Sequence, residues 1–204
     1  ALGHDATDVG GFNLIEKMVT KTLYDQSNYY GKNAIILEAI DSKFYTLPEG
    51  SAYLTRAELV ATEIDGFQAQ LDNAITWGYV DSVAMAVQPL ARYSKEDSSN
   101  GISATLAASA ESVNMRGINF LVMMQSSNGC IGDSYTPNNP WSLAQVLLLT
   151  SAFHINPLDE SQGGDFIKNG VTLFDNAAAF VDDNGNISEE LMSYQPEQLL
   201  LGLT

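Results

Sequence analysis

The sequence has few bases and almost no cysteine, and each shortage excludes a class of protein. Lys and Arg together number 9 against 25 Asp and Glu in 204 residues, which gives a formal net charge of -16. Such a chain repels phosphate backbones and anionic headgroups, so we expect no binding to nucleic acid or to acidic membranes. A single cysteine, Cys130, can close no internal disulfide and build no multi-cysteine metal site.

The sequence also lacks an apolar run of the roughly 18 residues that a membrane-spanning helix needs, so we expect no transmembrane segment. Its 45% hydrophobic and 17% charged residues are typical of a folded globular protein. The first residue is Ala1, and Ser, Asn, Thr and Gly are plentiful while Lys is scarce. Because removal of an export signal leaves such a start, we expect an exported protein, whether extracellular, periplasmic or lumenal.

Apolar residues recur at helical spacing along most of the chain, and period-two alternation is hard to find. Thr55 and Glu58 form a capping box ahead of the clearest helix, which Gly78 should break or bend. The apolar segments 34–40 and 118–124 fit either a helix or a core strand. Further helices are predicted over 12–26, 102–115, 142–154, 165–181 and 196–203.

These segments predict an all-α fold: a single multi-helix domain over 1–204, with about seven or eight helices around a buried central helix at 142–154. That helix has few polar positions, which is typical of a helix surrounded by others. The polar stretch 93–101 is the clearest linker. A domain boundary there would leave two small halves, so one domain is favoured.

One motif predicts an ion site near the end of the chain. Asp182, Asn184 and Glu190 would supply oxygen ligands for Ca²⁺, the sole cofactor that the sequence suggests. If Gly185 and Ile187 took the glycine and isoleucine positions of an EF-hand loop, the first ligand position would fall on an aromatic residue, which cannot bind an ion. The predicted site is therefore a shortened variant of that loop. The alternative interpretation is an ordinary loop between two helices, with Asp182–Gly185 as turn residues and Ser188 as the N-cap of the next helix.

Acidic residues could supply the catalytic groups of an enzyme. Glu58, Glu63, Asp65 and Asp72 share the long helix after Thr55, and paired carboxylates can do acid–base chemistry. We interpret these four residues instead as the solvated polar face of that helix. Two histidines with no Glu-x-x-His or His-x-x-x-His spacing give little support to a transition-metal centre.

The last stretch of the sequence is strongly apolar, through Leu199, Leu200, Leu201 and Leu203. Such a cluster is unfavourable in water, so we expect it to pack on its own domain or on a neighbouring chain. Because the sequence shows no catalytic constellation, these leucines favour a non-catalytic, acidic structural or assembly protein. Its partner would be a second copy of itself or another protein.

Two alternatives remain open. A helical binding module for a small apolar ligand would line its pocket with Met115, Met123, Met124, Trp77 and Trp141. An enzyme would gather scattered acids in a cleft. A deep, closed apolar cavity would favour the first, and a cleft with two or more acids of perturbed pKa would favour the second.

Overall fold

Helices build this protein. The computed structural model describes residues 5–24, 30–95, 100–159, 161, 164–182, 184, 186 and 188. These residues are 57% helical and form no strand, which confirms the all-α prediction. No helix among them is both long and apolar enough to cross a membrane.

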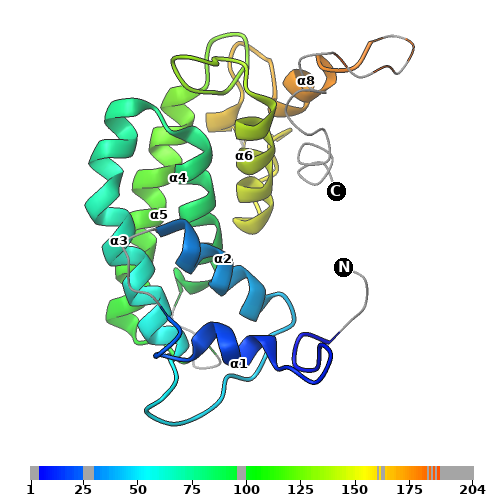
Figure 1. Cartoon of the computed structure of the whole chain (residues 1–204). Helices are drawn as coiled ribbons and strands as arrows, with labels where there is room; N and C mark the ends of the chain where they lie inside the picture. The colour runs from blue at the N-terminus through cyan, green and yellow to red at the C-terminus, as the bar shows by residue number, and fades with distance from the viewer. Residues whose placement is uncertain are drawn as a thin grey trace.

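The described helices follow one another in a simple order (Figure 1). They are α1 (Leu14–Val19), α2 (Tyr30–Asp41), α3 (Arg56–Trp77), α4 (Val80–Val87), η1 (Gln88–Tyr93), α5 (Ala104–Met124), α6 (Pro140–Ala152), η3 (Gly164–Phe166) and α8 (Leu173–Ala178). Helices η1 and η3 are 3₁₀-helices.

Helix α4 has helical neighbours on several sides, since it contacts α2, α3, α5, α6 and η1. Gly117 permits the close approach of α5, because a Cβ atom there would lie 2.7 Å from Val87 Cγ1. The helices before and after the stretch 93–101 pack together, with α3 and α4 both contacting α5 and α4 contacting α6.

The segment predicted as a central helix forms α6, which begins two residues earlier than expected. Leu143, Val146 and Leu149 are fully buried, and Leu147 is 2% exposed. The helix packs on α4, η1 and α8. Pro140 occupies its first position, where a proline loses no hydrogen bond, and this explains the early start.

The predicted start and end of α3 are confirmed, and the structure decides the two segments that the sequence left open. Thr55 and Glu58 form the expected capping box, and Gly78 ends α3 in the left-handed region at φ 72. The ambiguous segment 118–124 continues the helix that begins at Ala104. The other ambiguous segment lies within α2.

The helix predicted over 12–26 is wrong in extent. Helix α1 ends at Val19, because Thr20 takes extended backbone and forms a β-bridge with Tyr53. Leu23, an apolar residue inside the predicted range, lies beyond the end of α1 and is 59% exposed.

The single helix predicted over 165–181 is also wrong. Asn169 and Gly170 have φ angles of 54 and 79, and they form a tight turn that pairs Lys168 with Val171. An Asn-Gly dipeptide is a strong turn signal, and here it overrides the helical spacing of the apolar residues around it. The result is the short η3 before the turn and α8 after it.

Candidate functional site

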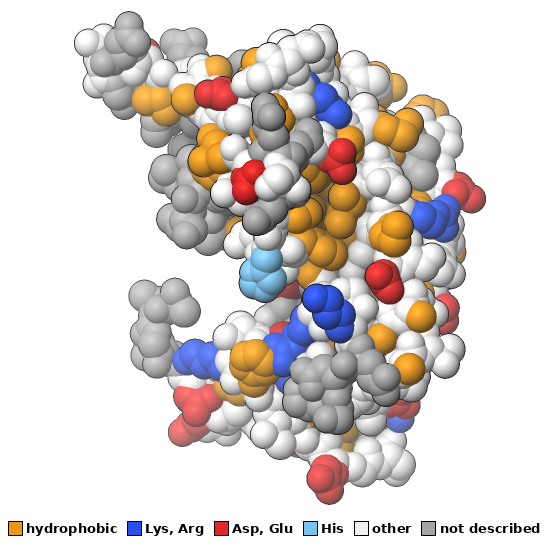
Figure 2. Space-filling model, turned by 180° about the vertical axis from the view of Figure 1, so that it is seen from behind, with side chains coloured by type: hydrophobic (Ala, Val, Ile, Leu, Met, Phe, Trp, Pro, Cys, Tyr) orange, Lys and Arg blue, Asp and Glu red, His pale blue; other side chains and the backbone are white. Residues whose placement is uncertain are grey.

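A cleft of about 690 Å³ opens where the end of α2, helix η1 and the end of α6 meet. Figure 2 shows this face of the molecule, where basic side chains lie beside the histidine at a hollow in the surface. The polar and charged side chains that line the cleft are Glu38, Asp41, Ser42, Gln88, Arg92, Ser94, Lys95 and His154.

Asp41 anchors one wall of the cleft. Its Oδ1 accepts a hydrogen bond from Arg56 Nε at 3.0 Å, and its Oδ2 accepts one from the Tyr93 hydroxyl at 2.5 Å. Arg56 also donates through Nη2 to the carbonyls of Ile40 and Tyr45. Burial, followed by the bond to Asp41, raises the pKa of the Tyr93 hydroxyl. This wall is therefore fixed by the protein itself.

Arg92 is positioned by two neighbours. Its Nε donates to Asn100 Oδ1 at 3.0 Å, and the Asn100 amide donates back to the Arg92 carbonyl at 3.2 Å. The centre of its guanidinium lies 3.7 Å from the centroid of the Phe44 ring, a cation–π contact. Within the described residues its two Nη nitrogens make no hydrogen bond, so they can donate to a ligand.

Helices α2 and α6 both end at this cleft with a non-glycine residue in the left-handed region. Phe44 has φ 53 and His154 has φ 55, and the residue after each donates its N–H to the carbonyl five positions earlier. Helices usually place glycine there, because a side chain costs about 1 kcal/mol. Three described non-glycine residues have positive φ: His154 lines this cleft, Phe44 contacts Arg92 of its lining, and Asn169 lies elsewhere. Strained backbone gathers at functional sites.

Two further polar groups face the cleft. Glu38 is accessible to solvent, yet the surrounding protein reduces its hydration and raises the pKa of its carboxyl. Gln88 Oε1 is buried without a hydrogen-bond partner. A buried acceptor without a partner is unfavourable, and an N–H or O–H group of a ligand would satisfy it.

Glu63 is a second acid with a raised pKa. Its side chain is 0% exposed, and neither carboxylate oxygen has a hydrogen-bond partner. Burial and the nearby charge of Glu38 raise its pKa to about 9, although the Ala34 backbone, which lies outside hydrogen-bonding geometry, lowers it. Its predicted place on a solvated face is wrong. It lies three residues after Val60 and four before Phe67, inside the apolar stripe of α3.

The other three acids of α3 are exposed, as predicted. Glu58 pairs with Lys21 at 2.9 Å, and Asp72 pairs with Arg116 at 3.3 Å. Exposed pairs of this kind contribute little to stability and supply no acid–base pair to the cleft.

The predicted calcium site is only partly described. Asp182 Oδ1 accepts the N–H groups of Asn184 at 2.9 Å and Asn186 at 2.7 Å, and its Oδ2 accepts the Asn186 amide. These bonds lower the pKa of Asp182 and build the turn of the alternative interpretation. Among the described residues no three His, Cys, Asp or Glu side chains are placed to bind a metal. Glu190 lies outside the described residues, so the calcium site stays a prediction.

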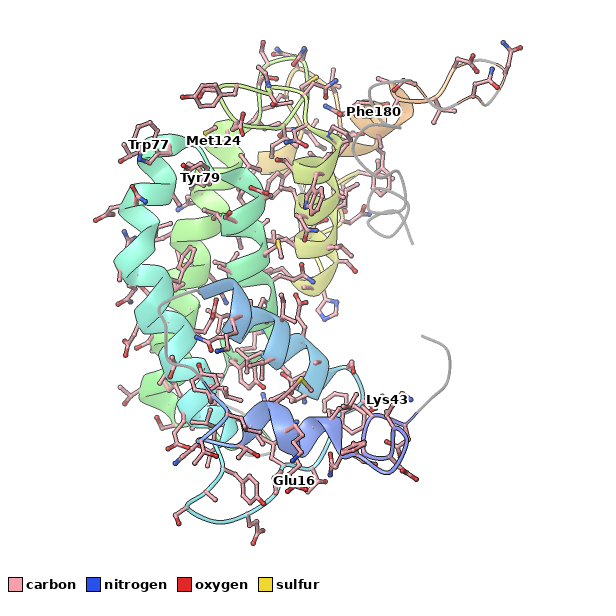
Figure 3. All side chains as sticks on the ribbon, viewed as in Figure 1. Glu16, Lys43, Trp77, Tyr79, Met124 and Phe180 are labelled. Carbon is pink, nitrogen blue, oxygen red and sulfur yellow. The ribbon has the colours of Figure 1, made fainter. Side chains whose placement is uncertain are left out.

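The other predicted residues do not come together in a described pocket. Leu199, Leu200, Leu201 and Leu203 lie outside the described residues, so their role in assembly stays a prediction. Of the residues proposed to line an apolar pocket, Met115, Met123 and Trp77 are 59%, 80% and 51% exposed. Figure 3 shows Trp77 at one end of the helical body, near Tyr79 and Met124.

Sequence reasoning missed most of the cleft. Its charged residues come from α2, from η1 and from the end of α6, and no spacing rule connects these three segments. Comparisons with protein-family models, with curated proteins and with solved structures find no match for this chain. Its function is therefore argued from the geometry of the cleft.

Proposed function

We propose that this chain is a binding module for a small ligand that carries an anionic group, a carboxylate or a phosphate, together with O–H or N–H donors. The observation that carries the proposal is the presence of Arg92, Lys95 and His154 around one cleft. These are two of only nine Lys and Arg residues, and one of two histidines, in a chain of net charge -16. A fold that places scarce cations together supports an anion site.

The acids of the cleft leave much of this positive charge uncompensated. Arg56 pairs with Asp41, so Glu38 is the lining acid whose charge opposes those of Arg92 and Lys95. The unpartnered Gln88 Oε1 adds an acceptor at the same place. A ligand with hydroxyl or amino groups beside its anionic group matches this mixture of donors and acceptors.

The cleft is preorganised, which favours affinity because little ordering remains to be done on binding. The contacts of Asp41 with Arg56 and Tyr93 fix one wall. The contacts of Arg92 with Phe44 and Asn100 fix the guanidinium.

Titration calorimetry with malate, a hydroxylated dianion, tests the proposal at constant ionic strength. We expect malate to bind, succinate, which lacks the hydroxyl, to bind more weakly, and chloride to give no heat. Arg92→Lys keeps the charge but loses the planar fork, so malate affinity should fall about tenfold. Lys95→Ala removes an exposed charge and should weaken binding without unfolding the chain.

Arg116→Ala is the matched control, because Arg116 is exposed and pairs with Asp72 away from the cleft. It should bind malate like the wild type. Equal affinities of the wild type, Arg92→Lys and Lys95→Ala would place the anion elsewhere and overturn the proposal. So would the absence of heat with malate, succinate and inorganic phosphate alike.

A further inference from the structure

Three exposed aromatic side chains lie around the turn that joins α3 to α4. Trp77 and Tyr79, on either side of the glycine that ends α3, are 51% and 42% exposed. Tyr135, in the loop after α5, is 80% exposed. We name this the aromatic surface and define it by these three residues. Large aromatic residues exposed close together are typical of an interaction site.

The loop after α5 lies against this turn at Gly78. A Cβ atom there would lie 3.1 Å from Met124 Cε and 3.9 Å from Asp133 Cβ. Asp133 in turn positions Tyr135, because its Oδ1 accepts the Tyr135 N–H at 2.8 Å. Figure 3 shows Met124 and Trp77 at this same end of the helical body. The loop therefore brings its tyrosine to the turn.

Two acids accompany the aromatic surface. Asp81 lies in the first turn of α4, two residues after Tyr79, and its carboxylate makes no hydrogen bond or ion pair with the described residues. Asp133 uses Oδ1 for N–H groups of its own loop, which leaves Oδ2 without a hydrogen bond in the same part of the chain. An aromatic face attracts a cation, and a carboxylate beside it adds to that attraction.

Bases are absent from the segments that build this end of the molecule. The sequence has no Lys or Arg in 57–91 or in 117–167, which contain most of α3, all of α4, the end of α5 and the loop after it. Arg116, directly before the second range, pairs with Asp72 at 3.3 Å. Lys168, in the turn before α8, approaches the loop from another element. Unpaired acids thus outnumber unpaired bases among the described residues here, which favours a cationic partner.

We propose that the aromatic surface binds an arginine-rich segment of a partner protein. The surface is open rather than enclosed, as the exposure of Tyr135 shows, so an extended segment can cover all three rings. Arginine suits it better than lysine, because a planar guanidinium stacks on a ring while its N–H groups bond to a carboxylate. A chain of net charge -16 also attracts such a segment at long range.

Fluorescence anisotropy of a labelled peptide of alternating Arg and Ala, titrated with the full chain, tests the proposal. Trp77→Ser with Tyr135→Ser removes two rings and keeps the net charge, so general attraction to an acidic chain survives the change. The affinity of this ring variant for the peptide should fall at least about tenfold. Asp81→Asn should lower the affinity about threefold, and a matching Lys–Ala peptide should bind the wild type more weakly.

Controls make matched changes outside the aromatic surface. Phe12→Ser removes an exposed ring from the turn before α1, and Asp65→Asn removes an exposed carboxylate from α3. Both should bind the Arg–Ala peptide like the wild type. Equal affinities of the wild type and the ring variant would reduce the binding to general charge attraction and overturn the proposal. Tighter binding of a Leu–Ser peptide would also overturn it, and so would a wild-type dimer that the ring variant dissociates, which would assign the surface to a second copy.

Discussion

Helix α2 borders two depressions whose chemistry differs. The cleft at its C-terminal end is lined by acids, bases and an amide, whereas the groove between α1 and α2 has an apolar floor with Lys17 and Lys32 in its lining. In the cleft, Asp41 is bonded to Arg56 and Tyr93. In the groove, the Lys32 ammonium lies 5.0 Å from the centroid of the Tyr24 ring. The comparison indicates that what a surface can bind depends on the contacts that its charged side chains make within the protein, and less on the mere presence of those side chains.

Glu63 lies within electrostatic reach of both depressions. Its charge acts on the hydroxyl of Tyr24, which lines the groove, and the charge of Glu38, which lines the cleft, acts on Glu63. It is fully buried, and neither oxygen has a partner. A neutral Glu63 leaves the interior of the protein at this position free of an unpaired charge.

The largest expected effect is the pH dependence that Glu63 creates. Its pKa is about 9 in the folded chain against an ordinary 4.5, so between these values the folded state keeps a proton that the unfolded state releases. The free energy of unfolding should therefore fall as pH rises, by about 1.4 kcal/mol per pH unit. Relative to the wild type, Glu63→Gln should gain roughly 4 kcal/mol between pH 5 and 8 in urea denaturation.

Asp65→Asn is the matched control for this prediction, because Asp65 is exposed two residues further along α3. Its unfolding free energy should run parallel to that of the wild type across the same pH range. Parallel curves for Glu63→Gln as well would mean that water reaches Glu63 in the folded chain.

Removal of Arg56 should have the next largest effect. The Arg56–Asp41 pair is mostly buried, with side chains 20% and 13% exposed, and Arg56→Ala would leave Asp41 without its charged partner. We expect a loss of about 3 kcal/mol in thermal or urea unfolding, together with weaker malate binding. Lys21→Ala breaks an exposed pair with Glu58 and should lose less than about 1 kcal/mol. Similar losses of unfolding free energy for both variants would contradict the interpretation that the Arg56–Asp41 pair fixes the wall of the cleft.

Phe44→Gly should change stability little but binding more. Glycine relieves the positive φ of Phe44, a gain of about 1 kcal/mol, and removes the cation–π contact with Arg92, a loss of similar size. The released guanidinium should raise the malate dissociation constant about threefold, which calorimetry measures. Asn169→Gly relieves a similar strain away from the cleft and should leave binding unchanged. Unaltered binding in Phe44→Gly would show that the ring does not position Arg92.

Local signals predicted much of the fold, because helix caps and turns depend on neighbouring residues. The capping box at Thr55 and the end of α3 at Gly78 were read directly from the sequence. The turn at Asn169 and Gly170 could have been predicted from the dipeptide in the same way, but the helical spacing of the neighbouring apolar residues was given more weight. The burial of Glu63 was also available, since its position in the apolar stripe of α3 is a local pattern.

The cleft could not be predicted, because it depends on how distant segments pack. The bases of the sequence appear scattered, and only the packing of η1 against α2 and α6 brings Arg92 and Lys95 beside His154. The strain at Phe44 and His154 has no signal in the sequence either, since neither residue is typical of the left-handed region at a helix end.

A two-dimensional ¹H–¹⁵N NMR titration with malate tests most directly whether the cleft, and not the groove between α1 and α2, binds the anion. The account predicts shift changes for the amides of Ser42, Ala91, Ser94 and His154 around the cleft, and none for Lys32 or Ile35 in the groove. Changes confined to the groove, or no change at malate concentrations that saturate a millimolar site, would contradict it.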